Sequence, residues 1–251
     1  MTLELLICTI GEGIGKLESS LLPPCDEVRY LISWQYIGRK PAIPTWLQER
    51  SDVRVIQLEG RGLSRNRNYA LAHASGDILK ICDDDEVWEQ AYFDTILETY
   101  RLHPDYDIVH FQAIGPRKNY PPHFVSSFEM TMRRSSLGDL RFDERFGLGS
   151  AQLCAGEEEV FLCDARKAKL SIHYEPLPIC RTNPKTTGTH WQSPLMQRSK
   201  GATFYYTKGL VYACLKSVRE SLSLMLKKGA NPLPIFRNMI WGVNYIRTWH
   251  Q

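Results

Sequence analysis

Strand-like and helix-like segments alternate over the first 110 residues, and this alternation limits the fold more than any other feature of the chain. Apolar runs typical of β-strands cover residues 3–10, 28–37, 53–58 and 78–82. Helical patterns separate or follow the later runs, at residues 64–74 and 89–102. Strands and helices joined by short connections are typical of a mainly parallel sheet with helices on both faces. We therefore predict an α/β fold.

The rest of the chain is less regular. We predict strands at residues 108–114 and 128–133, a helix at residues 157–168, and an extended, loop-rich stretch at residues 176–188. From Gly201 onward two helices are expected, separated by residues 229–232. The first of them carries one apolar stripe, formed by Leu210, Cys214, Val218, Leu222 and Leu226. Such stripes most often pack a helix onto the body of a protein.

Three consecutive aspartates, Asp83, Asp84 and Asp85, directly follow the strand-like run at residues 78–82. Ligands of open α/β sheets bind beyond the carboxyl ends of the strands, which is where the triplet falls. Three like charges repel one another unless they share a cation. Their hard oxygen ligands favour Mg²⁺ or Mn²⁺ over zinc. A solvated acidic turn is the alternative that the triplet alone leaves open.

Cysteine usage and charge bear on compartment and partners. The seven cysteines are scattered without a CxxC pair, which favours reduced core thiols in a cytosolic protein. Neither a signal peptide nor a membrane-spanning run is expected. Residues 201–251 hold seven basic residues and one acid, whereas the whole chain has a net charge of +3. This uneven charge weighs against nucleic-acid binding by the body and suits a tail that meets the inner face of an anionic membrane.

Several short motifs follow one another in a recognisable order. Residues 62–68 read Gly-Leu-Ser-Arg-Asn-Arg-Asn, and Ser75-Gly76-Asp77 precedes the strand that ends in the aspartates. Phe142-Asp143-Glu144, Gly156-Glu157-Glu158 and, after a Thr-Thr-Gly loop, His190 come later. Over residues 3–191 this order resembles the GT-A glycosyltransferases, in particular family 2. The resemblance implies a GT-A (Rossmann-like) fold with a nucleotide-sugar-binding half at 1–115, an acceptor-binding half at 116–200, and basic amphipathic C-terminal helices at 201–251.

The resemblance also implies roles for individual residues. Asp85 and Asp83 are expected to hold Mn²⁺ or Mg²⁺, with His190 as a further ligand. The donor nucleotide sugar is expected to meet Thr9, Ser64, Arg67, Asn68, Asp83 and Asp84. Among the aspartates, we expect Asp84 to point away from the other two and to tolerate replacement best. Glu158 is the expected catalytic base, with Glu157 orienting the acceptor.

Each of these roles has a simpler alternative. Acidic residues in a first helical turn complement the helix dipole without any catalytic role, and three adjacent glutamates are not separable by pattern. Arg67 could be a surface arginine paired with an acid, and His190 an ordinary loop histidine. The chain also departs from the family pattern, with Ser33-Trp34-Gln35 where an acidic residue is common, and with Glu158 where the family has Asp.

The motifs together predict a metal-dependent inverting glycosyltransferase of polysaccharide biosynthesis. It would move a hexose from UDP-galactose or UDP-glucose to a hydroxyl of a glycan or lipid-linked saccharide. A nucleotidyltransferase is one alternative, because Gly11-Glu12-Gly13-Ile14-Gly15-Lys16 partly matches a phosphate-binding loop. A non-catalytic sugar-nucleotide-binding protein is the other.

Overall fold

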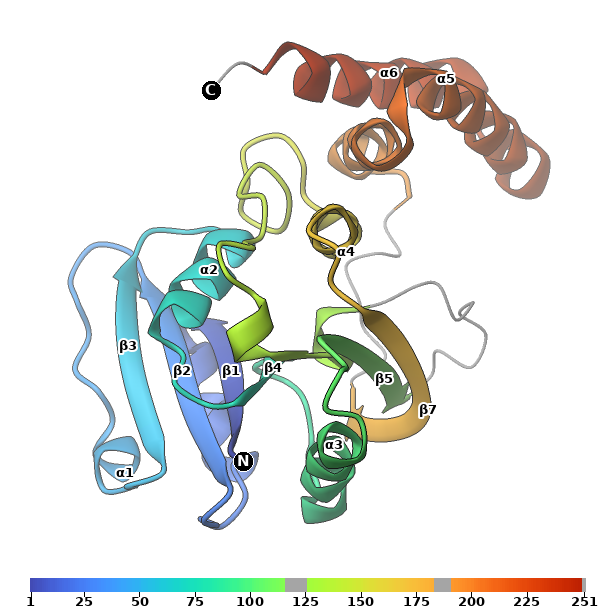
Figure 1. Ribbon diagram of the computed structural model, residues 1–251. Helices are drawn as coiled ribbons and strands as arrows, with labels where there is room; N and C mark the ends of the chain where they lie inside the picture. Colours follow the sequence, from blue (N-terminus) through green and yellow to red (C-terminus); the bar gives the residue numbers. More distant parts are fainter. Residues whose placement is uncertain (116–125, 183–190, 250–251) are drawn as a thin grey trace. The chain divides into compact units, whose positions relative to one another are not determined.

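A computed structural model describes residues 1–115, 126–182 and 191–249 of the chain (Figure 1). Contacts among these residues divide them into two compact units. The first unit comprises residues 1–61, 65–115, 126–141 and 164–182, and the second comprises residues 62–64, 142–163 and 191–249. Each unit is therefore built from several separate segments of the chain, whereas the divisions expected from the sequence are consecutive. That functional division into 1–115, 116–200 and 201–251 stays a prediction.

The first unit is built on one seven-stranded sheet with the order β3-β2-β1-β4-β6-β5-β7. Its strands are β1 (Leu3–Ile10), β2 (Val28–Tyr36), β3 (Val53–Glu59), β4 (Ile78–Asp83), β5 (Ile108–Ile114), β6 (Met130–Arg133) and β7 (Ile172–Arg181). Strand β6 runs antiparallel to both of its neighbours, and every other pairing is parallel. The predicted α/β fold with a mainly parallel sheet is confirmed.

Helices connect these strands. The α-helices up to residue 167 are α1 (Thr45–Gln48), α2 (Leu63–His73), α3 (Gln90–Leu102) and α4 (Glu157–Lys167), and three short 3₁₀ segments are η1 (Gly11–Ser19), η2 (Ser127–Glu129) and η3 (Arg134–Ser136). Side chains of the central strands and of α3 form the main core, in which Leu5, Ile7, Ile32 and Phe93 are fully buried. This core fixes the carboxyl ends of β1 and β4 side by side.

One strand escaped the sequence pattern. Residues 172–181 form strand β7, whereas residues 176–188 had been expected to be extended and rich in loops. Pro176 and Pro178 interrupt the run and hide its strand character. Proline lacks an amide hydrogen and is tolerated at the edge of a sheet, and β7 is an edge strand. The predicted strand at 128–133 is also shorter, because residues 127–129 form η2 and β6 begins at Met130.

The second unit contains two long helices, α5 (Pro194–Lys228) and α6 (Pro232–Thr248). Helix α5 begins seven residues before the expected Gly201, because Ser193 caps it with its side chain and Pro194 occupies the first turn. Gly209, with φ +80°, interrupts the helical geometry and puts a kink in α5. Among the residues that the structure describes, no helix is both long and apolar enough to cross a membrane.

Two glycines bring α5 and α6 into close contact. A Cβ atom on Gly201 would collide with the backbone carbonyl of Met239. Likewise, a Cβ on Gly242 would collide with the carbonyl of Arg198. The two helix backbones therefore touch at these positions with no side chain between them.

Candidate active site

The aspartate triplet lies at the carboxyl end of β4, beside the end of β1. Cys8 of β1 pairs in register with Asp83, so the residues that follow both strands meet at one edge of the sheet. There β1 continues into Thr9 and the η1 segment, and β4 continues into Asp84 and Asp85. Ligands of open α/β sheets bind beyond such strand ends, which is where the aspartates were expected.

Asp84 is held by groups of the β1 end. Its carboxylate accepts hydrogen bonds from the Thr9 hydroxyl at 2.6 Å and from the Lys16 ammonium at 2.9 Å. Gly13 leaves room for this contact, since a Cβ there would collide with both Asp84 and Thr9. The orientation expected for Asp84, away from the other two aspartates, stays a prediction. The contacts of Asp84 with Thr9 and Lys16 argue against the expectation that it tolerates replacement best.

Asp83 faces a buried arginine. Arg67 lies on α2 and is 1% exposed, so the alternative of a surface arginine is wrong. Its guanidinium donates to the Ser127 hydroxyl at 2.6 Å and lies 3.4 Å from an Asp83 carboxylate oxygen. Asp83 itself is partly exposed. Arg67 thus lies at one side of the site, next to Asp83. The sequence pattern did not reveal that Ser127 is a hydrogen-bond partner of Arg67.

A buried ion pair lies beneath the triplet, and sequence reasoning missed it. Lys80 and Glu86 are both fully buried, and their charged groups are 2.5 Å apart. The other Glu86 carboxylate oxygen accepts the backbone N–H of Asp83 at 2.7 Å. Burial alone would lower the pKa of Lys80, but Cys82 and the Glu86 carboxylate together hold it above its ordinary value. The pair anchors the turn that carries the aspartates; a lysine inside an apolar strand was the available signal.

Asp85 is exposed, and its surroundings suit a cation. Partial burial raises the pKa of Asp85 above its ordinary value, and the charges of Asp83 and Asp84 raise it further. A divalent cation would relieve this repulsion. The described residues contain no group of three or more His, Cys, Asp or Glu side chains placed to hold a metal. One or two carboxylates plus substrate phosphates are, however, the usual Mg²⁺ site of nucleotide enzymes. Asp83 and Asp85 fit that pattern.

The start of α2 is tied to the ends of two strands. Asn66 is buried, its side-chain oxygen accepts from the Ser33 hydroxyl at 2.6 Å, and its amide donates to the carbonyls of Ser33 and Thr9. Helix α2 begins at Leu63, and the Ser64 hydroxyl donates to the carbonyl of Phe146 at 2.6 Å within the second unit. Asn68 is half-buried on the same helix.

In the second unit, three glutamates open α4. Glu157 is buried, whereas Glu158 and Glu159 are partly exposed. Burial raises the pKa of Glu159 to about 7, and the adjacent Glu158 adds to the rise. Gly156 precedes them with φ +96°, and a Cβ there would collide with the hydroxyl of Thr203. The predicted metal ligand His190 lies outside the described residues.

Comparisons with known proteins agree with this fold. Residues 40–160 match the model of glycosyl transferase family 2. TarS of S. aureus, solved with UDP-GlcNAc as its fragment 1–349, has 15% identity and a TM-score of 0.60, over 97% of this chain and 82% of that one. Against the longer TarS structure the chain covers only 44% of that protein, with 91% of its own length aligned, 14% identity and a TM-score of 0.57. No curated protein matches significantly.

Two further solved structures are similar. The mannosyltransferase PcManGT from Pyrobaculum calidifontis, in complex with GDP-Man and Mn²⁺, has 16% identity and a TM-score of 0.56, over 98% of this chain and 70% of that one. Glucosyl-3-phosphoglycerate synthase from Mycobacterium tuberculosis, with Mn²⁺, UDP and phosphoglyceric acid, has 15% identity and a TM-score of 0.57, over 83% and 79%.

The chain therefore has a GT-A (Rossmann-like) fold, and residues 40–160 match the model of glycosyl transferase family 2. That match spans α2, the aspartate triplet and the first turn of α4.

Proposed function

We propose that the protein is a metal-dependent, inverting hexosyltransferase. UDP-galactose or UDP-glucose is the donor, and the acceptor is a hydroxyl of a glycan or lipid-linked saccharide in polysaccharide biosynthesis. The observation that carries the proposal is the anchoring of Asp83 at the carboxyl end of β4, where its N–H is bonded to buried Glu86, with Asp85 two residues further along the chain. Similar structures were solved with UDP-GlcNAc or with UDP, which supports a uridine nucleotide.

In this proposal most donor-site residues belong to the first unit, and Ser64 belongs to the second. Asp85 and Asp83 would hold Mn²⁺ or Mg²⁺, which when bound would supply positive charge to offset the charge of the departing diphosphate. Arg67, buried beside Asp83, keeps that carboxylate oriented. Thr9 holds Asp84, so the turn keeps its shape when the nucleotide binds. Ser64 and Asn68 on α2 complete the proposed donor-binding set, and His190 is a third proposed metal ligand.

The base is proposed in the second unit. The acceptor oxygen forms a bond to the anomeric carbon while the bond to the diphosphate breaks, and Glu158 takes the hydroxyl proton. Glu157 orients the acceptor. Glu159 is the alternative base, because its pKa of about 7 suits proton transfer near neutral pH. Family order favours Glu158.

Turnover of nucleotide sugars tests the metal role. Purified protein is screened against UDP-glucose, UDP-galactose, UDP-GlcNAc and GDP-mannose by thermal shift with and without Mn²⁺, and positive donors are then assayed for release of UDP or GDP. We expect Asp85→Asn to abolish metal-dependent stabilisation and to lower kcat by about two to three orders of magnitude. Asp105→Asn, which changes an exposed aspartate elsewhere, is the matched control and should leave both unchanged. Full activity of Asp85→Asn would remove the metal site proposed here.

Two glutamine variants assign the base. Glu158→Gln should lower kcat by about two to four orders of magnitude while donor-induced thermal stabilisation is kept, because proton transfer is lost and donor binding is not. Glu159→Gln should retain most of the activity. The reverse result would move the base to Glu159. Release of pyrophosphate from a nucleoside triphosphate, with no transfer from any nucleotide sugar, would favour the nucleotidyltransferase instead.

A further inference from the structure

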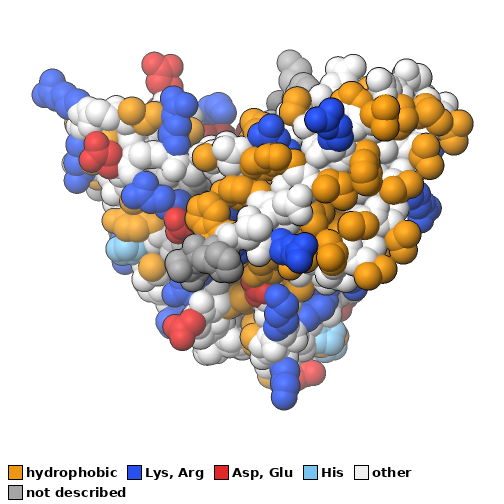
Figure 2. All heavy atoms as spheres, turned by 90° about the horizontal axis from the view of Figure 1, so that it is seen from above, with side chains coloured by type: hydrophobic (Ala, Val, Ile, Leu, Met, Phe, Trp, Pro, Cys, Tyr) orange, Lys and Arg blue, Asp and Glu red, His pale blue; other side chains and the backbone are white. Residues whose placement is uncertain are grey.

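The outer face of α5 after its kink is apolar and exposed. The exposed large apolar residues on this stretch are Leu210, Val211, Tyr212, Leu215, Val218, Leu222, Met225 and Leu226. Val211 is 75% exposed, Leu215 67% and Leu226 81%. Figure 2 shows many hydrophobic side chains gathered on one side of the molecule, with lysines and arginines among them. We call this the α5 outer face.

After its kink, helix α5 buries small side chains and exposes large apolar ones, which is the reverse of an ordinary packed helix. Its buried positions after the kink are Ala213, Ser217 and Ser221, which are small and spaced four residues apart. Helix α6 supplies the large buried side chains of the pair, among them Ile235 and Met239. The large side chains of α5 therefore face outward because small residues occupy its inner face. The predicted apolar stripe exists, but Leu210, Val218, Leu222 and Leu226 of it are exposed.

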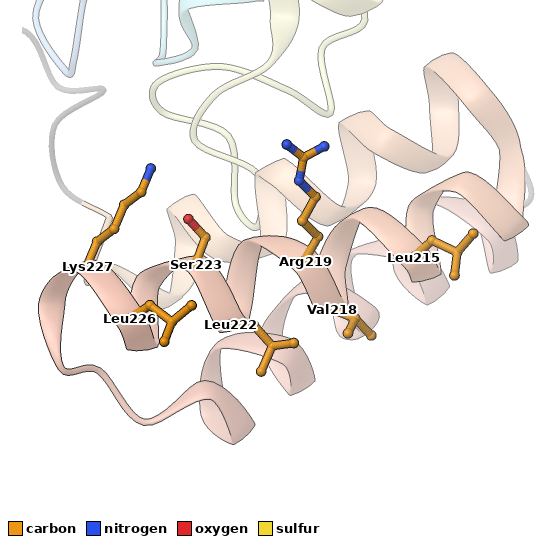
Figure 3. A pocket seen from close by; sticks show the side chains of 7 residues that line it. All are labelled: Leu215, Val218, Arg219, Leu222, Ser223, Leu226 and Lys227. Atoms are coloured by element: carbon orange, nitrogen blue, oxygen red, sulfur yellow. The ribbon is translucent and has the colours of Figure 1, made fainter.

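Basic groups border this face. An apolar groove on α5 is lined by Leu215, Val218, Arg219, Leu222, Ser223, Leu226 and Lys227. In Figure 3 the side chains of Arg219 and Lys227 extend to one side of α5, and Leu222 and Val218 extend to the other. The exposed cations of α5 and α6 are Lys208, Arg219, Lys227, Lys228, Arg237 and Arg247. The one acid of residues 201–251, Glu220, is paired with Lys216 at 3.0 Å.

Aromatic groups lie at the end of α6. The rings of Trp241 and Tyr245 stack with centroids 5.2 Å apart, and Tyr245 lies 5.3 Å from Trp249. Both tryptophans are exposed. Exposed tryptophan and tyrosine beside basic residues are typical of segments that lie in the headgroup region of a bilayer.

We propose that the α5 outer face docks the protein on an anionic lipid surface. The leucines and valines would enter the acyl boundary, and the bordering lysines and arginines would meet the lipid phosphates. A second copy of the chain is the less suitable occupant, since pairing two such faces would bring like charges together. The inference is independent of the proposed glycosyl transfer.

Vesicle flotation tests the docking with the full chain. Vesicles of equimolar phosphatidylglycerol and phosphatidylcholine are compared with vesicles of phosphatidylcholine alone. We expect binding to the anionic vesicles that weakens as salt is raised, and little binding to the neutral ones. Lys227→Gln with Lys228→Gln should weaken partitioning on the order of thirtyfold. Arg39→Gln with Lys40→Gln, an exposed basic pair of the first unit, should leave partitioning unchanged.

The apolar contribution has its own pair of variants. Leu215→Ser with Leu226→Ser should weaken partitioning on the order of a hundredfold. Leu102→Ser is the matched control, because Leu102 is a 65% exposed leucine of α3. Equal binding to neutral and anionic vesicles, or equal loss in the control, would overturn the proposal. So would a stable dimer in sedimentation velocity that the serine pair dissociates, since the face would then be an interface between copies.

Discussion

The buried pair of Lys80 and Glu86 offers the sharpest test of how the aspartate turn is held. Replacing Lys80 with Met removes the ammonium 2.5 Å from Glu86 and leaves a fully buried carboxylate without its cation. Breaking a buried pair in this way costs about 3–5 kcal/mol. A domain of this size is stable by only about 5–15 kcal/mol, so the loss is large. We expect Lys80→Met to lower the free energy of unfolding by about 3 kcal/mol or more.

The double variant Lys80→Met with Glu86→Gln separates charge from packing. Gln keeps an oxygen for the Asp83 N–H and an uncharged side chain in the apolar site, so much of the stability should return. Urea unfolding followed by circular dichroism gives the midpoint and slope for each variant. Lys167→Met is the control. The Lys167 side chain is 60% exposed and its ammonium pairs with Asp164, so its loss should cost under about 0.5 kcal/mol. A Lys80→Met cost below about 1 kcal/mol, or no recovery in the double variant, would refute the reasoning.

Three further predictions follow from named contacts. Asp84→Ala removes the acceptor of the Thr9 hydroxyl and should lower the free energy of unfolding by about 1–3 kcal/mol, measured by urea unfolding; an unchanged midpoint would contradict it. Burial raises the folded pKa of Glu159 from its ordinary 4.5 to about 7, so the contribution of Glu159 to stability is fully present below pH 4.5 and is lost as pH rises through 7. Glu159→Gln should therefore be more stable than wild type by about 1–2 kcal/mol at pH 8 and equally stable at pH 4, as measured by urea unfolding at the two pH values. Gly156→Ala, at φ +96° and against Thr203, should cost about 2–3 kcal/mol in thermal unfolding, and a Tm unchanged from wild type would exclude the strain.

Much of the first unit follows from local pattern. Continuous apolar runs place the four parallel strands β1 to β4 in their positions within a few residues, because strands buried on both faces carry few polar side chains. The place of Asp83 at a strand end follows as well, since its position depends only on where the run stops. The missed strand β7 shows the limit. Its edge position tolerates prolines that the pattern takes for a loop.

The site contacts depend on partners distant in sequence. Asp84 is held by Thr9, 75 residues earlier, and Arg67 by Ser127, 60 residues later. No local pattern indicates such pairs. Glu86 stands next to the triplet and still escaped prediction, because only the folded sheet places it against Lys80. The exposure of the α5 stripe could not be predicted either, because the spacing of its apolar residues is the same whether the stripe packs on a core or contacts lipid.

The contact of Gly201 and Gly242 with the backbone of the facing helix separates two tasks in the second unit. Main-chain contact sets the distance between α5 and α6, so the helix pair does not depend on the large side chains of α5. Those side chains are then free to differ in size or polarity without loosening the pair. The exposed residues of α5 could therefore be replaced to change what the protein binds, while the seven-stranded sheet and the contact between α5 and α6 stay unchanged.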